Sequence, residues 1–209
     1  MDTCEYIHYL FNRTQRYRFP FSENEIPKNG IYIMFEKGET AHSGDRIVSI
    51  GTHTGQDNLP SRLKEHFLRE NKDRSIFRKN IGRALLTRNK DSYLEIWNKD
   101  LTSAEARKKY SGMIDRDKQR EIEKEVTAHI QNNCTFIVFE VVDKNIRLEL
   151  ESKIISTVNL CKICAPSKNW LGNYSPKEKI RASGLWLVNK LNGKPLDSDD
   201  IKLIEENIK

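Results

Sequence analysis

The sequence predicts an α/β protein of the α+β type, in which a small, mainly antiparallel three-stranded sheet is flanked by helices. Two short apolar runs, 31–35 and 46–51, are separated by a polar loop, as expected for a hairpin. A third run, 135–142, is β-branched and aromatic throughout. Apolar residues at helical spacing fill much of the remaining chain, so helices should cover the sheet.

Residues 1–26 are expected to form an N-terminal arm or short helix. Tyr6, Tyr9 and Leu10 suggest an amphipathic segment, and it should end near Phe19 because Pro20 disfavours helix in the residue before it.

The first two strands follow a turn that ends at Gly30. Ile31 to Phe35 reads as a buried strand, and Arg46 to Gly51 reads as its antiparallel partner. Residues 37–45, which contain glycine and serine, are expected to be a polar loop.

Two amphipathic helices are expected next. The first begins near Leu59-Pro60-Ser61, where proline is well tolerated, and it places Arg62 and His66 on one face at positions i and i+4. The second, 75–86, carries basic residues among apolar ones. Residues 61–90 hold ten Arg and Lys against three acids, so a basic helix face is predicted here.

Residues 90–131 are interpreted as a helical insertion with helices at 103–110 and 116–130. The strand at 135–142 should lie at the sheet centre, and a helix at 146–158 should follow it. The main predicted domain spans 27–172.

A C-terminal helical extension is expected over 173–209. Helices are predicted at 184–191 and 198–208, the second capped by Ser198.

Composition limits the function classes. The chain has 209 residues and a net charge of +6, which favours a polyanionic partner such as nucleic acid. No apolar run is long enough to span a bilayer and no secretory signal is evident, so no membrane association and a cytoplasmic location are expected.

The cysteines are too few for a disulfide scaffold. Cys161 and Cys164 have half of a zinc-ribbon spacing, but no second close pair of Cys or His follows them. Reduced thiols are expected, with structural zinc and redox chemistry as lesser alternatives.

Four ordered motifs carry the functional signal. They are Gly30-Ile31-Tyr32, then Ile50-Gly51, then Arg62 with His66 one turn later, and finally Glu151 followed by Ile154 and Ile155. Their order and spacing resemble the GIY-YIG nuclease family over roughly residues 27–172.

The resemblance implies metal-dependent hydrolysis of DNA phosphodiester bonds. It makes Tyr32 the general base, with Arg62 bracing the scissile phosphate and His66 relaying a proton or contacting the phosphate. Glu151 would be the metal ligand, and a lone carboxylate suits Mg²⁺ or Mn²⁺ better than zinc. Tyr32 would need nearby positive charge to act near neutral pH.

One position departs from the family's pattern. Ser49 stands where the second motif normally begins with tyrosine, and it is too short to reach across a site as a phenol does. Either that tyrosine is dispensable, or His53 fills the space, or the site has decayed and the protein binds DNA without cutting it.

A restriction-type or repair-type endonuclease is the expected function, and a catalytically inactive DNA-binding module is the alternative. A protein-interaction scaffold is a more distant competitor. A homodimer is attractive for making two nicks. The residues expected to contact DNA are Arg69, Arg74, Arg78, Lys79, Arg83, Arg88 and Asn169.

Overall fold

The computed structural model describes residues 1–208, and it confirms the α+β class. The sheet is antiparallel with strand order β1-β4-β2-β3. The strands are β1 (Tyr17–Arg18), β2 (Gly30–Ala41), β3 (Gly44–Gly51) and β4 (Cys134–Glu140). The interior position expected for the third run is therefore confirmed. The prediction of three strands missed β1, which is only two residues long and pairs with β4.

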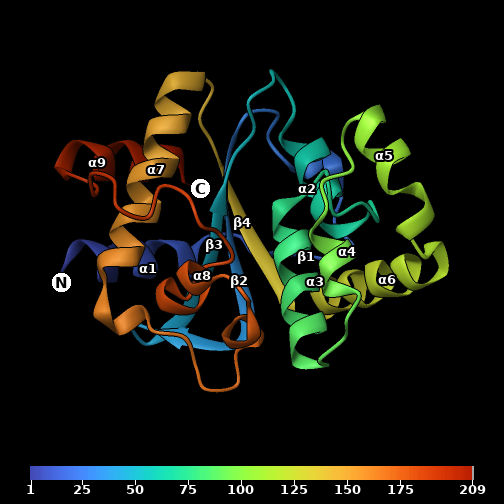
Figure 1. Ribbon diagram of the computed structural model, residues 1–209. Helices are drawn as coiled ribbons and strands as arrows, with labels where there is room; N and C mark the ends of the chain where they lie inside the picture. Colours follow the sequence, from blue (N-terminus) through green and yellow to red (C-terminus); the bar gives the residue numbers. More distant parts are fainter. Residues whose placement is uncertain (209) are drawn as a thin grey trace.

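Helices cover both faces of the sheet (Figure 1). On one side lie α1 (Thr3–Arg13), α7 (Lys144–Leu160) and α9 (Ser198–Asn207), while the short α8 (Glu178–Ser183) lies nearby. On the other side lie α2 (Leu59–Phe67), α3 (Ile76–Arg88), α4 (Leu94–Asn98), α5 (Ala104–Tyr110) and α6 (Arg116–Asn133). The 3₁₀ turns are η1 (Glu23–Glu25), η2 (Ser111–Met113), η3 (Lys162–Cys164) and η4 (Leu171–Tyr174).

Side chains along β2 point alternately to the two faces of the sheet, and each face packs against its own layer of the hydrophobic core. Ile31 and Ile33 face the layer formed with α1 and α7, whereas Tyr32 and Met34 face the layer formed with α2, α3 and α6. Successive strand residues point to opposite faces, so Tyr32 is directed toward the helix that carries Arg62.

Three local predictions were wrong. The cap of α9 is Asp197 and not Ser198. The expected loop at 37–45 is mostly strand, because β2 continues to Ala41 and turns through only His42 and Ser43. The segment 184–191 is not helical: Gly184 has φ of 69° and ends α8, and the backbone of Trp186 then donates to the Val48 carbonyl at 2.8 Å. In this segment a hydrogen bond to the edge strand β3 takes the place of the backbone hydrogen bonds of a helix.

The C-terminal segment packs on the nuclease-like part of the chain. Leu185, Leu191, Leu196 and Ile204 are buried in the same layer as α1 and α7. Within residues 1–208, no helix combines the length and apolar character needed to cross a membrane.

Candidate active site

Tyr32 lies at the end of the hairpin formed by β2 and β3, directly opposite Gly51. A Cβ atom at position 51 would lie 2.2 Å from the Tyr32 hydroxyl oxygen, so only glycine lets the phenol lie across the β3 backbone. At position 30, a Cβ would lie 2.2 Å from the Phe139 carbonyl oxygen of β4. The two motif glycines therefore allow close backbone approach on either side of Tyr32.

The Tyr32 hydroxyl is hydrogen-bonded to His66 on α2. Its oxygen lies 2.8 Å from His66 Nε2, and His66 Nδ1 lies 2.7 Å from Ser75 Oγ. Ser75 caps α3, and its Oγ accepts the backbone N–H of Arg78 at 3.2 Å. A proton on Nδ1 that is donated to Ser75 leaves Nε2 as the acceptor for the Tyr32 proton.

Burial controls the charge of this pair. It lowers the pKa of His66 well below 6.5, and the positive charges of Arg62 and Arg78 act in the same direction. Burial also raises the pKa of Tyr32 to about 12, although Arg62 acts against that rise. At neutral pH the pair is thus a neutral phenol beside a neutral imidazole.

Arg62 lies one turn before His66 on α2, as the i, i+4 spacing predicts. Its guanidinium donates to Glu65 Oε2 at 2.9 Å and to the Arg74 carbonyl at 2.8 Å. Its side chain remains 23% exposed, so it is held in place yet open to solvent.

Glu151 approaches from α7, on the opposite side of the sheet. It influences the ionisation of Tyr32, raising the pKa of the phenol, so the carboxylate lies within electrostatic reach of it. β3 is the edge strand, and the two helix layers can therefore meet around its end. The Glu151 carboxylate forms an ion pair with the Lys190 ammonium.

The four side chains come from β2, α2 and α7; His66 bonds the Tyr32 hydroxyl, and Arg62 and Glu151 both act on its ionisation. The whole chain from residue 8 to residue 209 matches the family model of the GIY-YIG domain. The chain belongs to the GIY-YIG family. Membership implies a nuclease-type function with DNA as substrate, and GIY-YIG nucleases generally depend on a divalent metal ion. Comparison with curated proteins and with solved structures gave no match.

Ser49 of this GIY-YIG domain is buried in β3 opposite Met34, on the same sheet face as Tyr32. His53, which was expected to fill the space of the missing phenol, contacts the backbone near the first motif. Its Nδ1 lies 2.6 Å from the Gly55 carbonyl and its Nε2 accepts the Gly30 N–H at 3.4 Å, so backbone groups use both ring nitrogens. In the structure the ring supports the turn after β3, and a catalytic role for His53 stays a prediction.

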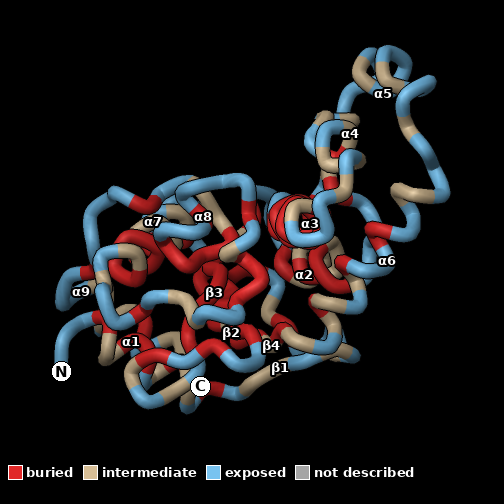
Figure 2. Tube along the Cα trace, turned by 60° about the horizontal axis from the view of Figure 1, so that its bottom comes forward, coloured by how far each residue is buried: buried red, intermediate tan, exposed pale blue. Residues whose placement is uncertain are grey.

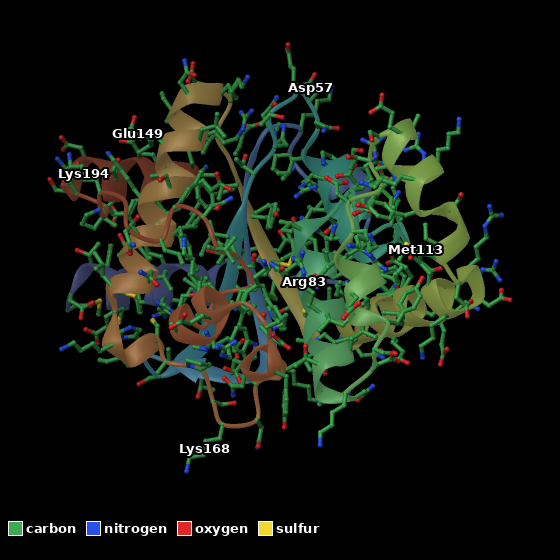
Figure 3. The ribbon with its side chains drawn as sticks, in the orientation of Figure 1. Asp57, Arg83, Met113, Glu149, Lys168 and Lys194 are labelled. Carbon is green, nitrogen blue, oxygen red and sulfur yellow. The ribbon has the colours of Figure 1, made fainter. Side chains whose placement is uncertain are left out.

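Asn169 is not brought to the site. It is exposed in a turn, and the neighbouring Trp170 is anchored by an indole hydrogen bond of 2.8 Å to Glu36 on β2. In Figure 3, its neighbour Lys168 lies at the opposite end of the molecule from Asp57, which follows the Gly51 end of β3. The predicted contact between Asn169 and the site is therefore wrong.

The basic face expected on α3 is largely buried. Arg78 is fully buried and pairs with Glu123 of α6 at 2.7 Å, and Lys79 pairs with Asp73 at 2.8 Å. Arg83 donates to Asn98 at 2.7 Å. These three side chains stabilise the packing of α3, which is almost entirely buried (Figure 2), so their assignment to DNA contact was wrong. Arg69, Arg74 and Arg88 are exposed, as that assignment requires.

Sequence reasoning missed three residues that shape the site. Glu65 and Ser75, which hold Arg62 and His66, carried local signals: Glu65 lies three residues after Arg62, and Ser75 precedes a helix. Lys190 lies 39 residues from its partner Glu151 and carried no such signal.

Proposed function

We propose that this protein is a metal-dependent endonuclease that hydrolyses DNA phosphodiester bonds, of the restriction or repair type. The observation that supports it most is the Tyr32–His66 hydrogen bond, with Arg62 and Glu151 both close enough to affect the ionisation of Tyr32. A phenol, an imidazole, a guanidinium and a carboxylate together match what this hydrolysis needs.

Tyr32 and His66 are proposed to move the proton of the attacking water. Tyr32 accepts that proton as its own hydroxyl proton passes to Nε2 of His66, which is neutral because burial lowers the pKa of the imidazole. The relay avoids forming a free tyrosinate, which a phenol with a pKa of about 12 would disfavour. It does so at the cost of a transient imidazolium on His66, which burial and the charges of Arg62 and Arg78 disfavour.

Arg62 is proposed to bind the non-bridging oxygens of the scissile phosphate. Glu65 and the Arg74 carbonyl fix the guanidinium, while its partial exposure leaves N–H groups free for a phosphate. Charge that develops on the phosphoryl oxygens is then stabilised without reorganisation of the side chain.

Glu151 fits the role of metal ligand. Its carboxylate already binds a cation, the Lys190 ammonium, and its side chain is 13% exposed. A single carboxylate completed by water and phosphate oxygens suits Mg²⁺ or Mn²⁺. The bound ion would supply Lewis-acid stabilisation of the leaving oxygen.

The proposed DNA surface continues from Arg62 onto exposed basic residues. Arg74 is joined to Arg62 through its carbonyl, and Arg74 and Arg107 line one hollow beside α5. Helix α5 stands away from the body of the molecule in Figure 2, and its last turn is basic. This path replaces the buried part of α3, while Arg69 and Arg88 remain proposed contacts. A homodimer also remains a proposal.

The direct test is cleavage of a supercoiled plasmid with Mg²⁺ or Mn²⁺ over a broad pH range. We expect nicking by the wild type, loss of nicking in Glu151→Ala, and near-normal nicking in the matched control Glu149→Ala. Glu149 is an exposed carboxylate on the same helix, and it pairs with Lys153 instead. An intact plasmid in every condition, or equal loss in both variants, would contradict the proposal.

The alternative of a catalytically inactive DNA-binding module rests on Ser49, which supplies no second phenol. It predicts salt-sensitive DNA binding without cleavage, and Tyr32→Phe would leave that binding unchanged. The plasmid assay separates the two functions.

A further inference from the structure

A cluster of sulfur and imidazole side chains lies at the other end of the β2–β3 hairpin. One ligand atom from each of Cys4, His8, His42 and Cys164 lies within 4.8 Å of the others. Cys4 and Cys164 are nearly inaccessible and His8 is fully buried. We propose that these four residues bind one zinc ion.

The two sulfur atoms are spaced as zinc requires. Cys4 Sγ lies 3.6 Å from Cys164 Sγ, which is far longer than a disulfide bond of about 2.05 Å. Two Zn–S bonds of about 2.3 Å in a tetrahedron place the sulfurs about 3.8 Å apart. The observed separation therefore fits two thiolates that share one metal ion.

The His8 ring is oriented for metal binding through Nε2. Its Nδ1 lies 2.9 Å from the Cys4 carbonyl oxygen, to which it donates. This backbone contact resembles the outer hydrogen bond that fixes the tautomer of most metal-binding histidines. The Nε2 atom lies 3.7 Å from Cys164 Sγ, and its other neighbour is the Ile47 N–H at a long 3.4 Å.

His42 provides the fourth ligand from a turn whose backbone is otherwise costly. His42 and Ser43 both have positive φ, 51° and 61°, where Asn-Gly is the favoured pair. The His42 ring packs against that of His8 with centroids 4.8 Å apart, so the turn holds the imidazole at the cluster. A ligand role explains why a histidine occupies this position.

The four ligands come from α1, the hairpin turn and η3, which are distant in sequence. A set of two nitrogen and two sulfur ligands favours zinc over Mg²⁺. Such a site would tie the N-terminal helix and the segment after α7 to the sheet. Along β2 it lies roughly 30 Å from Tyr32, at roughly 3.3 Å per residue, so its role is structural.

Cys161 is the neighbour that could compete for the fourth position. Its Sγ lies 3.2 Å from His42 Nε2. Because Cys161 is partly exposed and is not among the four clustered ligands, we assign it a contact beside the site.

The test measures metal content and thermal unfolding of the purified full-length protein. We expect about one zinc per chain, tetrahedral cobalt spectra with thiolate charge-transfer bands after exchange, and a Tm about 10 °C lower after chelation. His8→Gln, His42→Gln and Cys164→Ser should each lose bound zinc. Cys161→Ser should retain it, as should Cys134→Ser, which removes a buried thiol outside the cluster.

Three results would overturn the proposal. Zinc well below one equivalent in protein grown with ample zinc would do so, as would a Cys4–Cys164 disulfide found by mass spectrometry. Zinc loss in Cys161→Ser but not in His42→Gln would overturn the assigned ligand set. If a variant is too unstable to purify, the cobalt spectrum of the wild type serves as the test instead, because it reports the two thiolate ligands directly.

Discussion

Two regions carry basic side chains in different settings: the candidate active site around Tyr32, which we call the rim, and the buried helix α3, which we call the buried layer. The charges of these side chains are balanced differently in the two regions. Arg62 is partly exposed and is held by Glu65 and one carbonyl group. Arg78 is fully buried, and Glu123, the His66 carbonyl and Thr127 occupy its donors. The comparison shows that an arginine can bind a phosphate only where other groups of the protein leave some of its N–H donors unused.

The largest effect is expected on the rim. Arg62→Ala should lower single-turnover DNA cleavage by about 10³-fold, or about 4 kcal/mol of transition-state stabilisation, with little change in stability. Arg62→Lys should restore little, because an ammonium lacks the planar fork. Arg120→Ala, which removes an exposed arginine on α6 outside the proposed DNA contacts, is the matched control. A comparable loss in that variant would contradict a specific role for Arg62.

The buried layer should respond in the opposite way. Arg78→Ala leaves the Glu123 carboxylate buried without its partner, so it should cost about 3–5 kcal/mol in the free energy of unfolding, measured by urea denaturation. Arg78→Ala combined with Glu123→Ala should cost less than the two single changes added together. Unchanged stability in Arg78→Ala would contradict the structural role.

DNA affinity offers a smaller contrast. Arg74→Ala should weaken binding a few-fold and reduce the slope of log K against log salt by about 1, because Arg74 is exposed and would contact one phosphate. Lys79→Ala should leave the slope unchanged, since Lys79 is paired with Asp73. Equal slopes for both variants would show that burial does not decide which of these basic residues contact DNA.

The smallest expected change is with pH. Burial lowers the pKa of His66 well below 6.5 and raises that of Tyr32 to about 12, so neither group titrates between about pH 7 and 9. Cleavage at saturating metal should therefore vary by no more than about twofold over that range. A rise of about tenfold per pH unit would instead indicate that a pre-ionised Tyr32 is the base.

The sequence identified what depends on local spacing. Arg62 and His66 share a helix face because they are four residues apart. Gly30 precedes Tyr32 by two residues, and Gly51 faces Tyr32 because β2 and β3 are consecutive strands of one hairpin. The family was likewise visible in the order of the motifs, and the match over residues 8–209 confirms it.

Pairings between distant segments were not predictable. Glu123 lies 45 residues from Arg78, in a segment read only as an insertion, so the charge it neutralises looked exposed. Cys4 and Cys164 are separated by 160 residues, and Cys164 therefore appeared to lack a second pair of ligands. Only the packing of α1 and η3 on the hairpin brings those sulfur atoms together.

Single-turnover cleavage by Tyr32→Phe, compared with wild type at equal DNA occupancy and with folding checked by circular dichroism, tests the central claim most directly. The variant keeps the ring that packs under α2 and loses only the hydroxyl bonded to His66. We predict a rate lower by about 10²–10⁴-fold with unchanged DNA affinity. A rate within a few-fold of wild type would contradict the account, because Tyr32 would then carry no proton in the reaction.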